Sequence, residues 1–591
     1  MCGIFAYIGS NSNAPNLVLS GLKRLEYRGY DSWGIAGQAN NKIFVQKRAG
    51  KISDAKLFLP ACNTAVGHTR WATHGKVSNI NAHPHFSTDK SFVVVHNGIV
   101  ENYLPLKKSL INKGFKFVSE TDTEVIVRLV ESYRRNSNAL LDAAKKAFLK
   151  LSGRNTIILL AKNGDVIAIR NGSPLVVGIN KSSNEVFFSS DTLSFADKVE
   201  LCAVVQNGEI LSYQNGSKIV AFNILTGREA SLEWLPLNFA GADVGLEGFP
   251  HYMIKEIKEI PFVVKQITKI NKKDYLYLAK QIKKAQTVYT VGSGTTGIAA
   301  AQIAFYLRAF ANINAISLVG ADANEYLPLI TQKDLVIVPS QSGETADVLE
   351  FLEKVKKSKV KIASLVNMPG SMITRLSDFK FMNDAGPEIC VMSTKVFVSQ
   401  ISWGYLVAKT VSGKYSEGMK NLNTLSQVSG KYLSNKKISA TIRSLAKVVS
   451  KKADIFLLGK ADNFQIAKEA MVKIIEGSYI HAHAIPSGDL KHYAITLMEK
   501  GMLVIAIVPQ DSLKSDVLNA VDEVRARGAC TVGVSTQSYE GFDHFLPVPD
   551  CGEVNSIINI VPFQLLAYYT AVKLGNNVDR PRNIAKSVTV K

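Results

Sequence analysis

The second half of the chain alternates short apolar runs with amphipathic stretches, and it does so twice. Strands alternating with helices form a doubly wound parallel sheet. In both copies the last strand follows a proline, Pro339 or Pro509, at nearly the same spacing, so we infer an internal duplication. The first copy predicts strands at 287–291, 335–338 and 361–366 and helices at 298–310 and 346–357; the second predicts strands at 455–458, 503–508 and 530–534 and helices at 464–475 and 515–527.

The chain has 591 residues, which corresponds to three or four domains at roughly 150 residues each. Its hydrophobic fraction of 46% and charged fraction of 20% are typical of an ordinary globular protein in water. No apolar run reaches the length of about 20 residues that crosses a bilayer, and the start of the chain lacks the basic stretch of a secretory signal. We therefore expect a cytoplasmic protein with no membrane-spanning segment.

The net charge of +21 is the unusual bulk property, and it fits nucleic acid, anionic lipid or small anionic substrates. The lysines are spread in pairs along the chain, and no nucleic-acid-binding motif accompanies them. We therefore expect no nucleic-acid partner. The six cysteines are scattered without a C-x-x-C pair, so the sequence predicts neither a disulfide framework nor a metal site.

The first 220 residues have a different pattern, in which short β-branched and aromatic runs are broken by Gly and Asn. This pattern is typical of an α+β sandwich of β-sheets covered by helices, with polar motifs in its loops. Strands are predicted at 4–8, 43–46, 92–96, 156–160, 166–170, 175–178 and 185–189, and helices at 14–25 and 124–133.

The start of the chain, Met1-Cys2-Gly3-Ile4-Phe5, has a chemical interpretation. If Met1 is removed, which the small side chain at position 2 permits, Cys2 carries a thiol and a free α-amine on one residue. The amine has a pKa of roughly 7.7–8 and the thiol one of about 8.5, so the amine can take the proton of the thiol. The alternative is that Cys2 is a small hydrophobic residue opening a buried strand.

Polar loops of the first quarter contain residues suited to holding an amino acid beside that thiol. Arg70 can bind an α-carboxylate with its guanidinium fork, and Asp122 can bind an α-ammonium. Asn97 and the backbone N–H of Gly98 can form an oxyanion hole. Taken singly, these residues also fit a surface ion pair, a helix N-cap and a tight turn.

The start Cys2-Gly3-Ile4 and the segments 26–32, 67–75, 96–98 and 119–124 together resemble the class II, N-terminal-nucleophile glutamine amidotransferases. The resemblance implies that Cys2 is the nucleophile. It also places Trp71 on a mobile loop that gates ammonia passage, whereas a packed aromatic fits the same residue equally well. The glutamine site that the resemblance implies consists of Arg70, Trp71, Thr73, His74, Asn97, Gly98 and Asp122.

In the first βα copy, Ser340-Gln341-Ser342-Gly343-Glu344-Thr345 lies between a buried strand and a helix start. Hydroxyls and unpaired helix N–H groups then converge on one point, which predicts a phosphate site rather than a plain helix cap. The second copy has Pro509-Gln510-Asp511-Ser512 instead, and Asp511 would repel phosphate. We expect the second copy to serve structure or a different contact.

The two sheets resemble the SIS (sugar isomerase) fold, whose phosphosugar signature is Ser-Gln-Ser-Gly-Glu-Thr. The connector 251–257, the segments 388–395, 473–481 and 489–492, and the tail 579–590 resemble the isomerase half of the glucosamine-6-phosphate synthase family. The sugar-phosphate site that the resemblance implies consists of Ser293, Ser340, Gln341, Ser342, Thr345, Val391, Ser393, Lys473 and Ala585.

That family turns a 2-ketose phosphate into a 2-amino-aldose phosphate, which requires ring opening, imine formation and a proton moved from C1 to C2. The resemblance implies Glu476 for the proton transfer, His492 for the ring oxygen and Lys586 for a Schiff base. No metal or organic cofactor is expected, because Lys586 supplies the imine chemistry. The alternatives are a helix-face ion pair of Lys473 with Glu476, a buried histidine and a disordered tail lysine.

The sequence departs from the family around the expected sugar site. Gly292-Ser293-Gly294 stands where Gly-Thr-Ser is usual, so Ser293 can replace one hydroxyl while Gly294 loses another. Tyr493-Ala494 replaces a usual Gly-Pro. Further departures, where Glu, Ala and Glu are usual, are His483, Pro486 and Asp489.

The resemblance covers nearly the whole chain and implies five parts. They are an N-terminal-nucleophile glutaminase (1–230), a linker with a first helix (231–273), two SIS domains (274–425 and 440–578) and an active-site tail (579–591). The implied activity is the first step of amino-sugar synthesis, in which D-fructose 6-phosphate and L-glutamine give D-glucosamine 6-phosphate and L-glutamate. Ammonia would be channelled between the two sites, and the enzyme would be a homodimer.

Two alternatives belong to other functional classes. Another class II amidotransferase would need a pyrophosphate-binding acidic loop or an ATP loop, and neither is found in the sequence. A non-catalytic SIS sugar-phosphate sensor would tolerate the loss of Cys2, Glu476 and Lys586, and all three are present.

Overall fold

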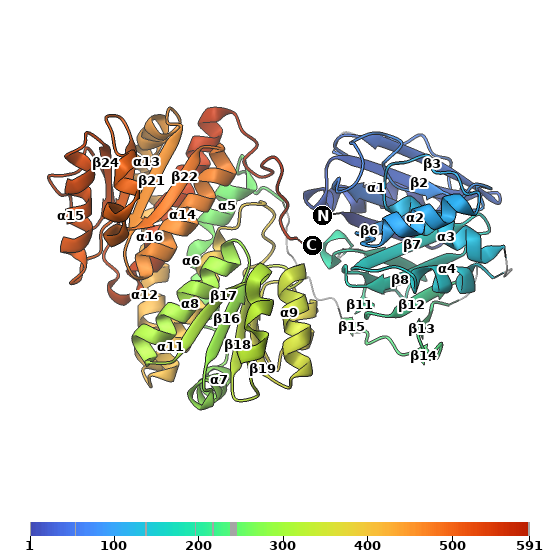
Figure 1. Ribbon diagram of the computed structural model, residues 1–591, viewed down its shortest axis with the longest axis horizontal. Helices are drawn as coiled ribbons and strands as arrows, with labels where there is room; N and C mark the ends of the chain where they lie inside the picture. The colour runs from blue at the N-terminus through green and yellow to red at the C-terminus, as the bar shows by residue number, and fades with distance from the viewer. Residues whose placement is uncertain are drawn as a thin grey trace. The chain divides into compact units, whose positions relative to one another are not determined.

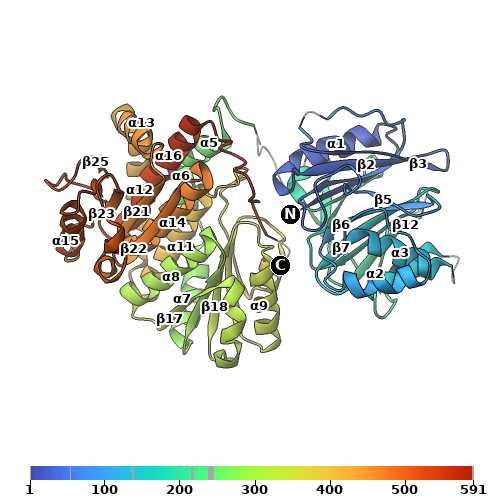
Figure 2. The same ribbon diagram turned by 45° about the horizontal axis from the view of Figure 1, so that its top comes forward.

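The computed structural model describes residues 2–53, 55–135, 139–195, 197–214, 218–236 and 245–588. The chain forms two compact units, unit 1 (Met1–Ala242 with Ser587–Lys591) and unit 2 (Asp243–Lys586). Figures 1 and 2 show both units. Met1 and residues 237–244, which include part of the expected linker, lie outside the described residues.

Unit 1 is built on two antiparallel sheets. The first has eight strands in the order β15 (Leu235–Pro236), β11 (Leu201–Val204), β9 (Val176–Asn180), β10 (Glu185–Ser189), β1 (Gly3–Ile8), β4 (Thr64–Arg70), β2 (Ser32–Ala39) and β3 (Lys42–Ala49). The second has seven strands in the order β14 (Glu229–Ala230), β13 (Val220–Asn223), β12 (Glu209–Tyr213), β8 (Val166–Asn171), β7 (Asn155–Ala161), β6 (Phe92–Gly98) and β5 (His85–Phe86).

These sheets pack face to face, and helices cover their outer faces (Figure 2). Apolar side chains of the two sheets, among them Ile4 and Ile158, meet in one buried layer. Burial of such a layer is the main favourable term in folding. The expected sandwich is confirmed. Its helices are α1 (Ala14–Arg24) over the first sheet and α2 (Tyr103–Asn112), α3 (Thr123–Arg134) and α4 (Leu140–Phe148) over the second.

Two segments of the expected glutamine site lie on strands rather than in loops. Residues 67–70 form the end of β4, and residues 96–98 form the end of β6, where Asn97 pairs with Thr156 of β7. The tight-turn interpretation of Asn97-Gly98 is therefore wrong. The neighbouring strand β2 was not predicted, because glycines interrupt its apolar pattern. Gly34 is required in this strand, because a Cβ would lie 2.1 Å from the carbonyl oxygen of His83.

Unit 2 contains two parallel sheets. The first has five strands in the order β17 (Ala315–Val319), β16 (Val288–Gly292), β18 (Leu335–Ser340), β19 (Lys361–Val366) and β20 (Phe379–Met382). Helices α8 (Thr295–Ala311) and α9 (Ala346–Lys357) cover opposite faces of it (Figure 1). The strand order reverses between β16 and β18, so the loops following these strands face one crevice.

The second sheet repeats this topology. Its order is β22 (His481–Pro486), β21 (Asp454–Gly459), β23 (Leu503–Ile507), β24 (Cys530–Ser535) and β25 (His544–Pro547), with α14 (Asp462–Ser478) and α15 (Lys514–Arg525) on opposite faces. Gly292 and Gly459 end equivalent strands, and a Cβ on either would lie 2.4 Å from the carbonyl oxygen four residues later. The chain therefore makes the same tight strand-to-helix turn twice.

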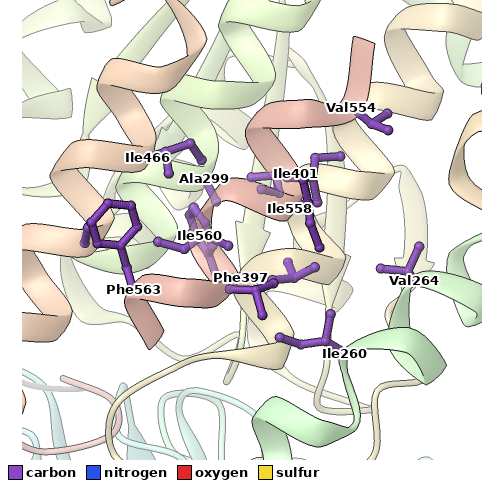
Figure 3. Packing of buried hydrophobic residues seen from close by; sticks show 14 of the residues in the cluster. Ile260, Val264, Ala299, Phe397, Ile401, Ile466, Val554, Ile558, Ile560 and Phe563 are labelled. Carbon is purple, nitrogen blue, oxygen red and sulfur yellow. The ribbon is translucent and has the colours of Figure 1, made fainter. Parts of the chain in front are cut away.

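One apolar layer joins the two sheets of unit 2. Figure 3 shows Ala299 of α8, Ile401 of α11 (Lys395–Val411), Ile466 of α14 and Ile558 of α16 (Asn555–Leu574) converging in this layer. All four side chains are fully buried or nearly so. Because the layer is continuous, the helices of one sheet are held against those of the other.

The helix Gly552–Leu574 is long and apolar enough to cross a bilayer, contrary to the expectation that no such stretch exists. However, 78% of its apolar window is buried inside the protein. A core helix surrounded by other elements has this composition, and α16 lies in the shared layer of unit 2.

The connector at the start of unit 2 forms two helices rather than the single helix expected within 231–273. They are α5 (Tyr252–Lys258) and α6 (Ile260–Ile267), and Pro261 starts the second because proline fits the first turn of a helix. Asp579 of the tail accepts hydrogen bonds from the backbone N–H groups of Tyr252 at 2.9 Å and Met253 at 2.8 Å. The tail thus caps α5 and is fixed at its start.

Candidate active sites

Cys2 lies directly before β1, and the pairing of β1 with β4 brings it to the end of that strand. Gly3 is opposite Thr69, and the N–H of Trp71 lies 3.3 Å from the Cys2 sulfur. Burial raises the pKa of the Cys2 thiol. A base is therefore needed to produce the thiolate, which is the nucleophilic form.

Arg70 ends β4 beside this thiol, and its positive charge acts on Cys2. Its Nη2 donates to the backbone carbonyl oxygens of His74 and Gly75. Its Nη1 is buried and has no hydrogen-bond partner among the described residues. A buried guanidinium nitrogen without a partner is costly, and it fits an anionic ligand group.

Asp122 also lies close enough to Cys2 for its charge to act on the thiol. It occupies the N-cap position of α3, but its side chain makes no capping hydrogen bond. Instead, its Oδ2 accepts a hydrogen bond from the N–H of Val100 at 2.8 Å. The carboxylate is thus turned away from the helix end that a plain N-cap would serve.

Asn97 is held by hydrogen bonds at both ends of its side-chain amide. Its Oδ1 lies 3.1 Å from Nε2 of His68, and its Nδ2 donates to Oγ of Ser190 at 2.8 Å. The same Ser190 oxygen accepts a hydrogen bond from the N–H of Ile4, two residues after the thiol, also at 2.8 Å. Asn97 and the start of β1 therefore share one acceptor, which sequence reasoning did not find.

Gly98 follows with a φ of +139°, a region that side chains disfavour. A Cβ at this position would also lie 2.1 Å from the carbonyl oxygen of Arg154. Position 98 therefore requires glycine for two reasons. Its backbone N–H lies at the end of β6, where the pairing with β7 holds it in place.

The remaining predicted glutamine-site residues lie on the segment after β4. Trp71 is half-buried, and the centroid of its ring lies 5.5 Å from that of Tyr30. Thr73 is exposed, and the ring of His74 packs 5.0 Å from that of Tyr103. The structure brings Arg70, Asp122 and Cys2 together, while the roles of Trp71, Thr73 and His74 stay predictions.

Four buried histidines lie next to Asn97, and the sequence assigned them no role. The ring of His83 lies 4.2 Å from that of His68, 4.9 Å from that of His85 and 6.5 Å from that of His96. All four are at most 4% exposed. Burial lowers the pKa of each, that of His68 to about 3. The cluster is therefore uncharged at neutral pH.

In unit 2, residues 340–345 follow β18 at the crevice of the first sheet. Oγ of the buried Ser340 accepts a hydrogen bond from the N–H of Gly343 at 2.9 Å, which closes the loop. Thr345 is the N-cap of α9, yet its side chain does not cap the helix. Ser293, after β16, has a buried Oγ without a partner among the described residues. Gln341 and Ser342 are half-buried in the same loop.

Lys586 of the tail is buried in an ion pair, not disordered. Its Nζ lies 2.5 Å from Oε2 of Glu388 and donates to the carbonyl oxygen of Cys390 at 2.7 Å. Although burial acts to raise it, the Lys586 ammonium holds the pKa of Glu388 below its usual value. The motif 388–395 was recognised in the sequence, but the role of Glu388 was not.

The other residues predicted around this lysine lie on the same two segments. Oγ of Ser393 donates to Glu388 at 2.9 Å, and the N–H of Val391 donates to the carbonyl oxygen of Asp579 at 2.9 Å. Ala585 is half-buried beside Lys586. Segment 388–395 and the tail therefore form one connected wall.

Helix α14 adds a second buried ion cluster. Nζ of Lys473 lies 2.6 Å from Glu476 and 3.4 Å from Glu469, and Oγ1 of Thr295 donates to Glu469 at 3.1 Å. Burial raises the pKa of Glu469 to about 8. Burial acts to lower the pKa of Lys473, but the two carboxylates outweigh it and raise that pKa. The second sheet thus contributes α14 to the crevice of the first, and Glu469 was missed in the sequence.

His492 is the one predicted catalytic residue that does not join these contacts. It is exposed at the end of a 3₁₀ helix, Ser487–His492, and makes no hydrogen bond within the described part of the chain. The interpretation as a buried histidine is therefore wrong.

Comparison with known proteins identifies the families of the two units. The glutamine amidotransferase domain family matches residues 68–197, and the SIS domain family matches residues 281–409 and 448–572. Glutamine–fructose-6-phosphate aminotransferase (isomerizing) from Caldanaerobacter subterraneus subsp. tengcongensis is 36% identical over 619 residues, covering 100% of both chains. The protein of the same name from Pyrococcus horikoshii is 36% identical over 604 residues, again covering 100% of both chains.

A solved structure supports the fold of unit 2. The C-terminal domain of glucosamine-fructose-6-phosphate aminotransferase from Francisella tularensis is 29% identical, with a TM-score of 0.52, and covers 57% of this chain and 99% of that one. The fold and sites define a glutamine amidotransferase joined to a pair of SIS domains. The chain belongs to the glutamine–fructose-6-phosphate aminotransferase (isomerizing) family. The resemblance identified from the motifs is confirmed.

The histidine cluster predicts an acid-labile unit 1. A histidine whose pKa is lowered on folding contributes stability that is complete above its unfolded pKa of about 6.5 and is lost as pH falls toward the folded pKa. We expect His68→Gln to reduce the pH dependence of unfolding by up to one proton, or about 1.4 kcal/mol per pH unit between pH 6 and 4. Urea unfolding followed by tryptophan fluorescence measures this, since Trp33, Trp71 and Trp234 lie in unit 1.

The matched control is His481→Gln, because the side chain of His481 is 69% exposed in unit 2. It should leave the acid slope unchanged. An equal slope for wild type and His68→Gln would contradict the assignment of a neutral buried His68.

Proposed function

We propose that the chain converts D-fructose 6-phosphate and L-glutamine to D-glucosamine 6-phosphate and L-glutamate, as an isomerizing aminotransferase. The carrying observation is that one chain holds both a thiol flanked by Arg70 and Asp122 and a lysine buried beside Glu388. Full-length relatives bearing that enzyme's name support the assignment. Ammonia released in unit 1 is the nitrogen donor for unit 2.

In unit 1, the α-amine of Cys2, free once residue 1 is removed, takes the proton of the thiol. The thiolate attacks the side-chain amide carbon of glutamine, and the oxyanion is held by Asn97 and the N–H of Gly98. The Cys2 ammonium returns its proton to the amide nitrogen, so that ammonia leaves and a thioester remains. Water then hydrolyses the thioester to release glutamate. The free Nη1 of Arg70 suits the α-carboxylate of glutamine, and Asp122 suits its α-ammonium.

In unit 2, the hydroxyls at 340–345 and Ser293 hold the phosphate at the start of α9. Lys586 passes its proton to Glu388 and attacks the C2 carbonyl of the open sugar, with loss of water. Ammonia replaces the lysine, leaving an imine at C2. Glu476 removes a proton from C1 and delivers it to C2, while the proton of the C1 hydroxyl passes to the imine nitrogen, which yields the amino aldose. Lys473 keeps Glu476 oriented at 2.6 Å.

The alternatives fit these observations less well. A sugar-phosphate sensor has no use for a lysine, Lys586, that is buried in an ion pair at the sugar crevice. Another class II amidotransferase would not combine unit 1 with two SIS domains. We propose a cytoplasmic enzyme that needs no nucleic acid or membrane.

Replacing Cys2 tests whether unit 1 releases the ammonia that unit 2 uses. We expect Cys2→Ala to abolish glucosamine 6-phosphate formation from glutamine while retaining it from ammonium salts, because unit 2 needs only ammonia. The control is Cys62→Ala, since Cys62 is buried in the core of unit 1 away from the site. Product formation by coupled assay measures both reactions. Wild type that hydrolyses glutamine but makes no amino sugar would contradict the proposed acceptor.

The shared acceptor Ser190 tests the oxyanion hole. Ser190→Ala leaves the amide of Asn97 and the N–H of Ile4 without their acceptor. We expect kcat for glutamine hydrolysis to fall by about 10- to 100-fold with KM nearly unchanged, because the loss acts on the transition state. The neighbouring Ser189→Ala is the control, since the Ser189 hydroxyl pairs with Ser194 instead. Equal kcat values for the two variants would exclude the positioning role.

The exposed His492 extends the proposal to a homodimer, in which it serves the sugar site of the partner. Mixing Lys586→Arg with His492→Asn, each inactive alone, should then restore about a quarter of wild-type activity, because half of the dimers gain one complete site. Light scattering gives the oligomeric state. A monomer that is active at high dilution, or no restored activity in dimers, would contradict this arrangement.

A further inference from the structure

Tyr479 follows the last residue of α14 in a backbone conformation that its side chain disfavours. Its φ of +60° and ψ of +15° lie in the left-handed region. Glycine and, less often, asparagine occupy this position at helix ends, because other side chains are strained there. The N–H of Tyr479 bonds to the carbonyl oxygen of Ile475 at 3.0 Å, which glycine would do equally well. Ending the helix therefore does not explain the tyrosine, and strain of this kind persists where other contacts offset it.

The contacts of the Tyr479 side chain are with the C-terminal tail. Its hydroxyl accepts a hydrogen bond from the backbone N–H of Arg582 at 2.9 Å. The guanidinium of the same arginine lies over the tyrosine ring, 4.2 Å from the ring centroid. A cation over an aromatic face is attracted to it, and the hydrogen bond adds to that attraction. Tyr479 thus holds both the main chain and the side chain of Arg582.

The place of Arg582 in the tail gives these contacts a consequence for the sugar site. Arg582 lies four residues before Lys586, whose ammonium is paired with Glu388. The tail is also fixed at its start, where Asp579 caps α5. Arg582 itself is exposed, and terminal segments at a protein surface fray unless they are tied down. The contact with Tyr479 ties the tail down between its start and the lysine.

The helix that ends at this contact carries another group of the proposed reaction. Glu476 lies three residues before Tyr479 on α14, and Lys473 holds its carboxylate at 2.6 Å. Asn576, which precedes the tail, donates from Nδ2 to the carbonyl oxygen of Gly477 at 3.0 Å. The end of α14 is therefore joined to the C-terminal segment at two successive turns of the chain. This junction fixes the segment that carries the imine-forming lysine against the helix that carries the proton-transferring carboxylate.

We propose that Tyr479 is a positioning residue for Lys586, holding the tail so that the lysine amine meets the C2 carbonyl of the sugar. This inference rests on the proposed function, in which Lys586 forms an imine with the open sugar. In that step the amine nitrogen adds to C2, and the two protons of the neutral amine leave with the carbonyl oxygen as water. Tyr479 acts through Arg582 and not on the sugar. Its loss should therefore slow the approach of the amine without weakening the binding of the phosphate.

Reduction of the imine with borohydride tests this role in the full-length protein. D-Fructose 6-phosphate is added without glutamine or ammonia, samples are reduced at timed points, and mass spectrometry measures the fraction of chains modified at Lys586. The rate at saturating sugar measures the approach of the amine, whereas the half-saturating concentration measures sugar binding.

Tyr479→Phe keeps the ring under Arg582 and removes only the hydroxyl. We expect the saturating rate of imine formation to fall about 2- to 10-fold, the range for one lost hydrogen bond. The half-saturating concentration should stay within about twofold of the wild-type value, because the variant acts on positioning and not on binding.

Tyr479→Asn separates positioning from stability, since asparagine tolerates the left-handed conformation. It removes the hydrogen bond and the aromatic face together, so we expect the saturating rate to fall at least about 10-fold. Circular dichroism at the assay temperature checks that the helices are retained. The matched control is Tyr569→Phe: Arg443 lies over the Tyr569 ring at 4.8 Å, but the hydroxyl bonds to Ser439 and not to the tail. This variant should react at the wild-type rate.

A wild-type rate in Tyr479→Asn would overturn the positioning role. A higher half-saturating concentration with an unchanged saturating rate would also overturn it, as would an equal loss of rate in Tyr569→Phe. A wild-type protein that gives no modified Lys586 would instead contradict the imine step of the proposed function, and this inference with it.

Discussion

The apolar layer shared by α8, α11, α14 and α16 is the constraint on which the chemistry of unit 2 depends. It fixes the helices of the two sheets against each other, so that α14 of the second sheet reaches the crevice of the first. The contact of Thr295 with Glu469 marks that meeting. Neither sheet alone holds both a phosphate loop of hydroxyls and a buried Lys–Glu pair. The layer therefore builds one site from two copies.

The two copies have diverged in side chains while keeping their backbone. Gly294 and Ala461 hold the same unusual backbone conformation, with φ values of +57° and +53°. An alanine there is strained, so the turn is imposed by the surrounding fold rather than chosen locally. The residues that follow differ in charge: Thr295 in one copy and Asp462 in the other. The two copies therefore keep one backbone at the crevice while differing in the charge that they present there.

The sequence predicted repeated, strongly apolar elements best. Helix 346–357 and strand 361–366 agree with α9 and β19 residue for residue, because a buried strand and an amphipathic helix have strong periodicity. The edge strand β22 was missed, since its sequence His-Ala-His-Ala-Ile-Pro is weakly apolar. Contacts across distant segments were also invisible: nothing local links Ser190 with Asn97, or Glu388 with Lys586. The family motifs named these segments without revealing their partners.

Burial raises the pKa of two carboxyl groups near the lysines of unit 2. Glu256 accepts hydrogen bonds from the N–H groups of Ile389 and Cys390, and burial raises its pKa to about 8, as it does for Glu469. Both acids are therefore largely neutral at pH 7, and Lys586 and Lys473 are each left with one carboxylate partner. The positive charge of each lysine is thus neutralised by a carboxylate of the protein, without a sugar phosphate. In the proposed reaction, hydroxyls and helix N–H groups would then meet the phosphate charge, and Lys586 would be left for the sugar carbonyl.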